Sequence, residues 1–158
     1  SFTGRDIVDF LEQAMADNVA MELRHNDGAS IETRLERAFL VTDIQSRKMG
    51  LMTSGATVAM CLVTKDSNNN ILIYSANAGD ARAVVSCIDD DTTTNNNRHH
   101  QQQAYRLTKD HRAEDPEETM RIQNAGGFVI RNRVLGILAV ARSLGDHGMK
   151  QYVIAQPH

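Results

Sequence analysis

The chain has 158 residues, and its 41% of hydrophobic side chains can form the core of one domain or the middle of a larger one. A formal net charge of −3 leaves no basic stripe for nucleic acid, and no apolar run approaches the about 18 residues of a transmembrane helix. Cys61 and Cys87 lie in apolar runs, where buried reduced thiols are expected. These features predict a soluble intracellular protein, cytoplasmic or nuclear, that binds neither nucleic acid nor membrane.

The first fifty residues have the periodicity of two amphipathic helices. Apolar residues recur along 6–23 at the spacing of one helical face, and Asn26-Asp27-Gly28 interrupts the pattern. Ser30 is placed to cap a second helix that continues to about Arg47. One face of this second helix collects Ile31, Leu35, Ala38, Phe39 and Thr42.

Strands are predicted next. Residues 57–64 and 71–76 are apolar on both alternating faces, so each strand is expected to be covered above and below. The polar residues 66–70 form the turn between them. A turn at Gly79-Asp80 leads into 82–86, which predicts a meander of three antiparallel strands.

Residues 89–103 differ in composition from the rest of the chain. They include three Asp, three Thr, three Asn, two His and three Gln, and none of these side chains favours burial. We expect a disordered insertion between two hairpin strands, the second at 104–108. His99 and His100 lie inside it, where a mobile loop offers a metal no fixed geometry.

A third helix is predicted after this strand. Asp115 is placed as its N-cap, Pro116 occupies the first helical position, and Gly126-Gly127 ends it. Two further strands and a short helical turn are expected at 128–130, 134–140 and 141–144. Helices that alternate with antiparallel strands buried on both faces indicate a layered α+β domain.

Five phrases of the sequence occur in an order and spacing that point to one family. They are SGATV at 54–58, ANAGDARAVV at 76–85, LTKDHRA at 107–113, RIQNAGGFV at 121–129 and RVLGILAVARSLGD at 133–146. Together they resemble the metal-dependent protein serine/threonine phosphatases of type 2C, the PPM family. The resemblance extends over nearly the whole chain, although Ala56 and Ala141 stand where the family has serine.

The resemblance implies an α-β-β-α sandwich, two stacked antiparallel sheets flanked by helices. Residues 1–158 would be the central part of a single such domain and would supply one helical layer and part of each sheet. The family's DGH metal motif would lie just before Ser1, and its DG and DN motifs would lie beyond His158. We therefore expect these 158 residues alone to be inactive.

The resemblance also implies an activity. Such enzymes hydrolyse phosphoserine and phosphothreonine in phosphorylated proteins with a water activated by Mg²⁺ or Mn²⁺, and a monomeric enzyme is expected. Only Asp110 matches one of the family's acidic metal positions, that of a weaker third cation; the alternative is a turn residue at a strand end. A second hypothesis is a pseudophosphatase-like scaffold or regulatory binding module with the same fold. Retention of Asp110 favours the enzyme.

Other polar residues carry weaker hypotheses. Asp80 and Asp146 follow glycines, where ordinary turn chemistry is favoured over metal binding, and Asp146 could pair with Arg142. Arg82 is expected to hold a turn. His111, which follows Asp110, is expected to be a structural hydrogen-bonding residue rather than the general acid.

For three further residues, a functional role is excluded or stays open. Ser54 has no His/Asp pair at useful spacing and is not expected to be a nucleophile. Arg131 and Arg133 could face a substrate phosphate or form a solvated strand edge.

Overall fold

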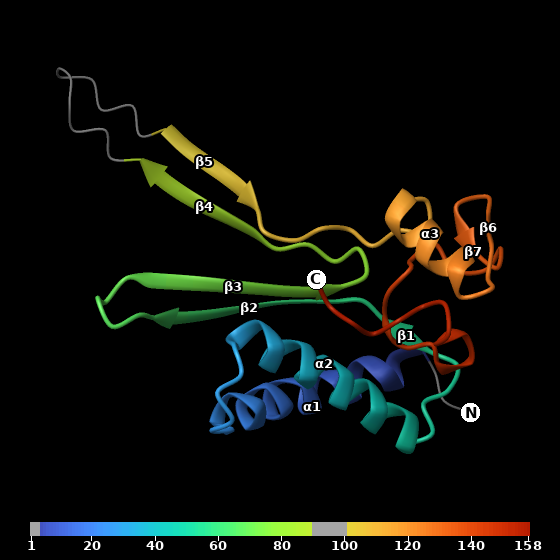
Figure 1. Cartoon of the computed structure of the whole chain (residues 1–158), viewed down its shortest axis with the longest axis horizontal. Coiled ribbons are helices and arrows are strands. Elements are labelled where there is room, and N and C mark those ends of the chain that lie inside the picture. Colours follow the sequence, from blue (N-terminus) through green and yellow to red (C-terminus); the bar gives the residue numbers. More distant parts are fainter. Residues whose placement is uncertain (1–3, 90–100) are drawn as a thin grey trace.

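The computed structural model describes residues 4–89 and 101–158. Figure 1 shows helices α1 and α2 beneath the β2–β3 hairpin, the β4–β5 hairpin above it, and α3 with β6 and β7 at one end. Helices and antiparallel strands in separate layers confirm the predicted α+β class. Among the described residues, no helix is long and apolar enough to cross a membrane.

The helical layer consists of α1 (Gly4–Arg24) and α2 (Ile31–Lys48). Ser30 has extended backbone angles, and its Oγ accepts a hydrogen bond from the Thr33 amide at 3.3 Å, which confirms the predicted cap. The turn between the helices is held by the buried guanidinium of Arg34, which donates to the Glu22 carbonyl at 2.7 Å. The expected apolar face of α2 is buried in the main core, with Leu35, Ala38, Phe39 and Thr42.

The strands form two separate hairpins. β2 (Val58–Lys65) pairs with β3 (Ile71–Ala78), and β4 (Val84–Asp89) pairs with β5 (Gln101–Arg106), in both cases antiparallel. The predicted three-stranded meander is wrong, because β4 forms its ladder with β5 and not with β3. Gly79, at φ +103°, lets the chain turn away after β3, where a Cβ would lie 2.2 Å from the Thr57 side chain.

The two ends of the β2–β3 hairpin have different surroundings. Ala76 and Ala78 are buried against the helices, whereas Val63 and Ile71 are 62% and 66% exposed near the turn. The expectation that these strands are covered on both faces is therefore wrong at this end. Cys61 and Cys87 are free and exposed, so the expectation of buried thiols is wrong too.

The prediction of an insertion at 89–103 is wrong at both ends, which belong to strands. Asp89 and the residues 101–103 pair as the ends of β4 and β5, because an antiparallel ladder can continue through polar residues whose main chains still bond. The remainder of that prediction, at 90–100, lies outside the described residues.

The C-terminal third contains α3 (Pro116–Asn124) and three short strands, and a fourth short strand, β1, lies earlier in the chain, before β2. Asp115 caps α3 by accepting from the Glu117 amide at 2.9 Å, and Gly126, at φ +85°, follows the helix end as predicted. The short strands pair as β1 with β8 and β6 with β7, with bounds Gly55–Ala56, Leu144–Gly145, Val129–Ile130 and Arg133–Val134.

Two predictions for this region are wrong. The expected strand at 134–140 is limited to Val134, and the expected helical turn at 141–144 ends in strand β8. Hydrogen bonds to other segments hold this stretch extended, among them Ala141 N to the His111 carbonyl at 2.9 Å. A 3₁₀ turn, His147–Met149, follows β8. A second, smaller core lies here, built on Ala113, Ile122, Val134, Ala141 and Val153.

Candidate functional site

Asp110 lies in the loop between β5 and α3 and is surrounded by arginines. Arg82, just before β4, donates Nε to Oδ1 at 3.1 Å and Nη2 to Oδ2 at 2.6 Å. Arg106, the last residue of β5, donates Nη2 to Oδ1, and Arg112 Nε lies 3.7 Å from Oδ2. We call Arg82, Arg106 and Arg112 the arginine cluster.

The arginine cluster determines the charge state of Asp110. The hydrogen bond from Arg82 is the chief cause that holds the pKa of Asp110 below its ordinary value, and it outweighs the opposing effect of desolvation. The carboxylate is therefore ionised at neutral pH. Its side chain is 15% exposed, whereas the three arginine side chains are between 42% and 54% exposed.

Asp80 contributes a second carboxylate to this surface. Its Oδ2 lies 3.2 Å from Arg112 Nη2, so it belongs to an ion pair in addition to its place in the turn after β3. Three guanidinium groups face two carboxylates, which leaves one formal positive charge. Arg82 was predicted to hold the turn at Gly79-Asp80, but its guanidinium instead ties the start of β4 to Asp110 in the loop after β5.

The residue that follows Asp110, His111, faces the protein interior. His111 is 1% exposed, and its Nδ1 lies 3.3 Å from the Gly79 amide, which donates to it. Burial lowers the pKa of His111 to about 4, so the ring is neutral at physiological pH. Asn77 donates to the Lys109 carbonyl at 2.6 Å from the same buried space. This geometry agrees with the structural role predicted for His111.

A second carboxylate with arginines lies under α3. Glu118 accepts from Arg121 Nη2 at 2.8 Å and from Arg142 Nε at 2.9 Å, and its side chain is 4% exposed. We call Glu118, Arg121 and Arg142 the buried ion group. The two guanidinium groups also donate to main-chain carbonyl oxygens, those of Ala141, Tyr152 and Gln156.

The predicted pairing of Asp146 with Arg142 is wrong. Arg142 is committed to Glu118, and Asp146 instead accepts a hydrogen bond from Ser143 Oγ at 2.6 Å. Asp146 has φ +46°, in the left-handed region, which turns its side chain back over Gly55, where a Cβ would lie 1.9 Å from its Oδ2. A structural role for Asp146 follows from these contacts.

The remaining predicted residues lie away from Asp110. Ser54 Oγ is buried and has no hydrogen-bond partner among the described residues. Arg131 is exposed, with φ +51°, and Arg133 donates to the Ile137 carbonyl at 2.7 Å on its own hairpin. Neither of these two arginines forms an ion pair with a described carboxylate. Their geometry matches the solvated-edge alternative.

Sequence reasoning missed Asn77 and Glu118 as organising residues. Asn77 was detectable as a polar residue inside an otherwise apolar strand, because a buried amide needs partners. Glu118 had no such signal, since it looks like one of several acidic residues in the first turn of α3.

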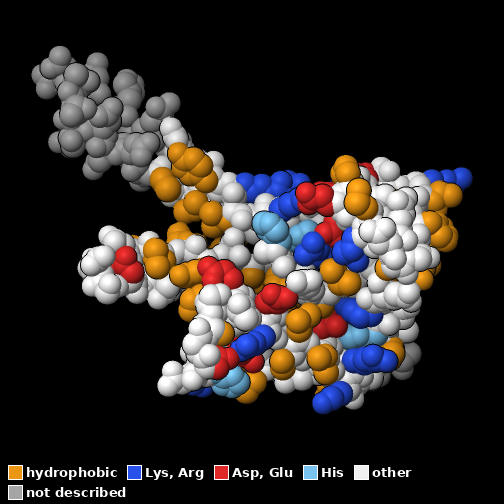
Figure 2. Space-filling view, viewed as in Figure 1, with side chains coloured by type: hydrophobic (Ala, Val, Ile, Leu, Met, Phe, Trp, Pro, Cys, Tyr) orange, Lys and Arg blue, Asp and Glu red, His pale blue; other side chains and the backbone are white. Residues whose placement is uncertain are grey.

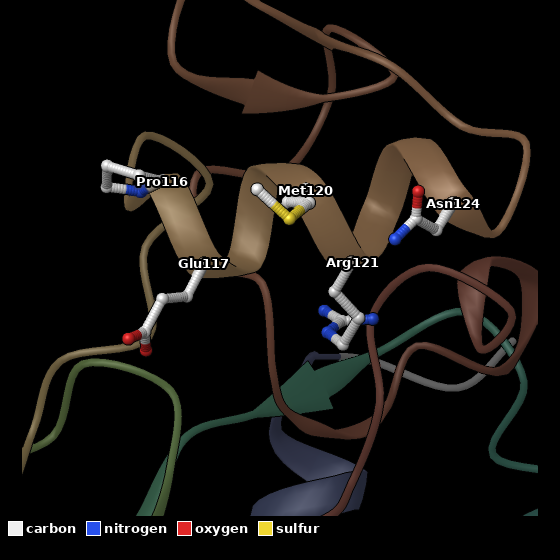
Figure 3. Close-up of a pocket in the computed structure, with 5 residues that line it drawn as sticks. All are labelled: Pro116, Glu117, Met120, Arg121 and Asn124. Atoms are coloured by element: carbon white, nitrogen blue, oxygen red, sulfur yellow. The ribbon is translucent and has the colours of Figure 1, made fainter.

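A hollow of about 420 Å³ lies along the outside of α3. It is lined by Pro116, Glu117, Met120, Arg121 and Asn124, all from this one helix (Figure 3). In Figure 3 the Glu117 and Arg121 side chains point away from each other toward neighbouring segments, so no polar groups converge in the hollow. It does not include Asp110.

A metal site is not completed within the described part of the chain. No group of three or more His, Cys, Asp or Glu side chains there is arranged to hold an ion. Hard cations such as Mg²⁺ and Mn²⁺ take several oxygen ligands. Asp110 alone does not meet this requirement, and its role as a ligand stays a prediction.

Comparison with known proteins places these motifs in one family. The protein phosphatase 2C family model matches residues 2–158. A probable protein phosphatase 2C from Oryza sativa subsp. japonica is 35% identical over 98% of this chain and 36% of its own length. Protein phosphatase 2C homolog 1 of Schizosaccharomyces pombe is 38% identical over 65% of this chain and 26% of its own length. The chain thus spans about a quarter to just over a third of the length of these relatives.

Solved structures show the same fold. A C. elegans sex-determining protein aligns over 94% of this chain and 35% of its own, with a TM-score of 0.71 and 23% identity. A phosphatase from a pathogenic strain of Toxoplasma gondii aligns over 95% of this chain and 59% of its own, with a TM-score of 0.59 and 19% identity. With the family match across residues 2–158, these findings establish that the chain belongs to the protein phosphatase 2C family.

Proposed function

We propose that this chain serves in the hydrolysis of phosphoserine and phosphothreonine in proteins, with Mg²⁺ or Mn²⁺ as the required cation. The observation that carries the proposal is the family match across residues 2–158, supported by curated relatives named as protein phosphatases. Bound divalent cations supply this chemistry by activating a water and neutralising phosphoryl oxygens.

Asp110 is the proposed contact between this chain and a cation. Its carboxylate is ionised at neutral pH and offers only oxygen acceptors, the ligand type that hard cations prefer. Arg82 and Arg106 now occupy both of its oxygens, so a cation there must share the carboxylate with them and needs further ligands. The described residues do not provide those ligands, and no catalytic step is assigned to any of their side chains.

An intracellular site of action is part of the proposal. Cys61 and Cys87 are both free and exposed, a state that a reducing compartment maintains and an oxidising one does not favour. Phosphorylated proteins of the same compartment are the proposed substrates.

The test is phosphate release from a phosphothreonine peptide. The natural protein that contains this segment should turn over in the presence of MnCl₂ and lose activity in EDTA, whereas residues 1–158 alone should show no turnover. A natural protein that binds the phosphopeptide but never hydrolyses it would replace the proposed enzyme with the scaffold alternative.

Asp110→Ala in that natural protein tests the ligand assignment. If Asp110 contacts a weaker third cation, turnover should fall by about one to several orders of magnitude, mainly in kcat, because the lost charge acts on the transition state more than on substrate binding. Parental kcat at every Mn²⁺ concentration would end the assignment.

A further inference from the structure

The arginine cluster presents unused hydrogen-bond donors on the surface. Its members come from three segments: the start of β4, the end of β5 and the loop before α3. Within the described part of the chain, Nη1 of Arg82 and both Nε and Nη1 of Arg106 make no hydrogen bond. Figure 2 shows basic side chains gathered where the β4–β5 hairpin meets the body of the molecule. Three convergent guanidinium groups with spare donors form a preorganised surface for an anion.

Charge balance at this surface favours a compact anion. The two carboxylates, Asp80 and Asp110, leave one of the three positive charges uncompensated. Asp110 fixes the guanidinium groups from the buried side, and their outer faces are about half exposed. A phosphomonoester carries about −1.5 to −2 charges and three acceptor oxygens, which guanidinium groups bind in paired hydrogen bonds.

We propose that Arg82, Arg106 and Arg112 form a docking site for a phosphorylated side chain of a protein partner. The choice of a phosphoprotein as partner rests on the proposed function, but the anion site itself stands on the arginine geometry. This site would bind a phosphoryl group through the arginine donors themselves.

A nucleic acid fits the same surface poorly. The chain has a net charge of −3. Lys109, the next basic residue after Arg106 in the sequence, is already paired with Glu117 at 2.5 Å and with Asp115 at 3.6 Å. A polyanion that extended past the arginine cluster would meet these carboxylates, whereas a single phosphoryl group would not. The partner is therefore a phosphopeptide segment.

The experiment measures phosphopeptide binding by the 158-residue chain in EDTA, using calorimetry with a phosphoserine peptide and its unphosphorylated twin. Only the phosphorylated peptide should bind, and affinity should fall as NaCl is raised. Arg106→Gln and Arg112→Gln should each weaken binding by about tenfold, because each removes a charged hydrogen-bond donor. Arg106→Lys should retain part of the affinity.

Two further variants separate a docking site from ion pairs that only hold the fold. Asp80→Asn removes the partly buried counter-charge of Arg112 and should tighten phosphopeptide binding severalfold, a gain that a merely structural network would not show. Arg133→Gln makes the same charge change on the β6–β7 hairpin and should leave affinity unchanged. Thermal melts confirm that each variant is folded.

Three results would overturn the inference. They are equal binding of the two peptides, unchanged affinity in both Arg106→Gln and Arg112→Gln, and tighter binding of a single-stranded oligonucleotide than of the phosphopeptide. Because EDTA excludes turnover, these outcomes do not depend on the phosphatase assay. Loss of the proposed enzymatic function with phosphopeptide binding intact would leave the docking site standing.

Discussion

The buried ion group and the arginine cluster consist of the same kinds of charged side chain but differ in role. Each centres on a carboxylate held by guanidinium groups, Glu118 in one and Asp110 in the other. The arginines around Glu118 also donate to main-chain carbonyls, whereas within the described residues Arg82 and Arg106 donate only to Asp110 and keep further donors free toward solvent. Where the donors are consumed by the protein's own backbone, the group fixes the fold; where they stay free, it can bind a ligand.

Electrostatics distinguishes the two carboxylates in the same way. Desolvation is the largest influence on Glu118, and the hydrogen bonds and charges of Arg142 and Arg121 together bring its pKa below the ordinary value. For Asp110 the hydrogen bond from Arg82 is itself the largest influence, and desolvation comes second. Removal of a partner from the buried ion group therefore exposes a larger desolvation cost than removal of one from the arginine cluster.

The largest expected effect is the loss of Glu118. Glu118→Ala leaves Arg121 and Arg142 without their counter-ion beneath α3, and the free energy of unfolding should fall by about 3–5 kcal/mol. Chemical denaturation at pH 7 measures it. Glu117→Ala, at the neighbouring exposed position, is the matched control and should stay within about 0.5 kcal/mol of the parent. Equal effects of the two substitutions would remove the distinction between the regions.

An effect of intermediate size on the free energy of unfolding is expected on acidification, through the buried side chain of His111. Burial, with the nearby charge of Arg142, holds the pKa of His111 at about 4 in the folded chain, below about 6.5 in the unfolded chain. The folded state therefore binds fewer protons, and stability that is full above pH 6.5 is lost as the pH falls toward 4. Between pH 6.5 and 5 the loss should be about 2 kcal/mol.

Substitution of the histidine tests the source of that loss. His111→Gln lowers stability at every pH, but its further loss between pH 6.5 and 5 should be smaller than that of the parent. A parental slope in His111→Gln would assign the acid sensitivity to other groups, such as His147, whose pKa burial also lowers.

The sequence predicts the local features of these regions but not their long-range contacts, for a physical reason. The caps Ser30 and Asp115 were predictable because a capping side chain bonds an amide two or three residues away. The antiparallel pairing of β1 with β8 and the ion pair of Arg142 with Glu118 join segments far apart in the chain, and local pattern does not specify such partners. Residues 141–144 therefore looked helical and are extended.

The same limit applies to the candidate site. Family motifs identified Asp110 by its place in LTKDH, but its three arginine neighbours come from separate segments, and only Arg82 was expected to hold a turn. Burial on both faces of β2 and β3 was inferred from apolar content alone. That content does not say which residues will lie against Val63 or Ile71, and within this structure they stay exposed.

The smallest expected effect is that of Asp110→Asn on stability. Its arginine partners are about half exposed and can be hydrated when the carboxylate charge is lost, so the free energy of unfolding should fall by only about 1 kcal/mol. The loss should shrink in 0.5 M NaCl, because salt screens exposed charges. Denaturation at low and high salt, beside Glu118→Gln, measures both. If Asp110→Asn lost as much stability as Glu118→Gln, and lost it equally at low and high salt, Asp110 would be a second buried residue that stabilises the fold. The spare arginine donors would then no longer indicate a binding surface.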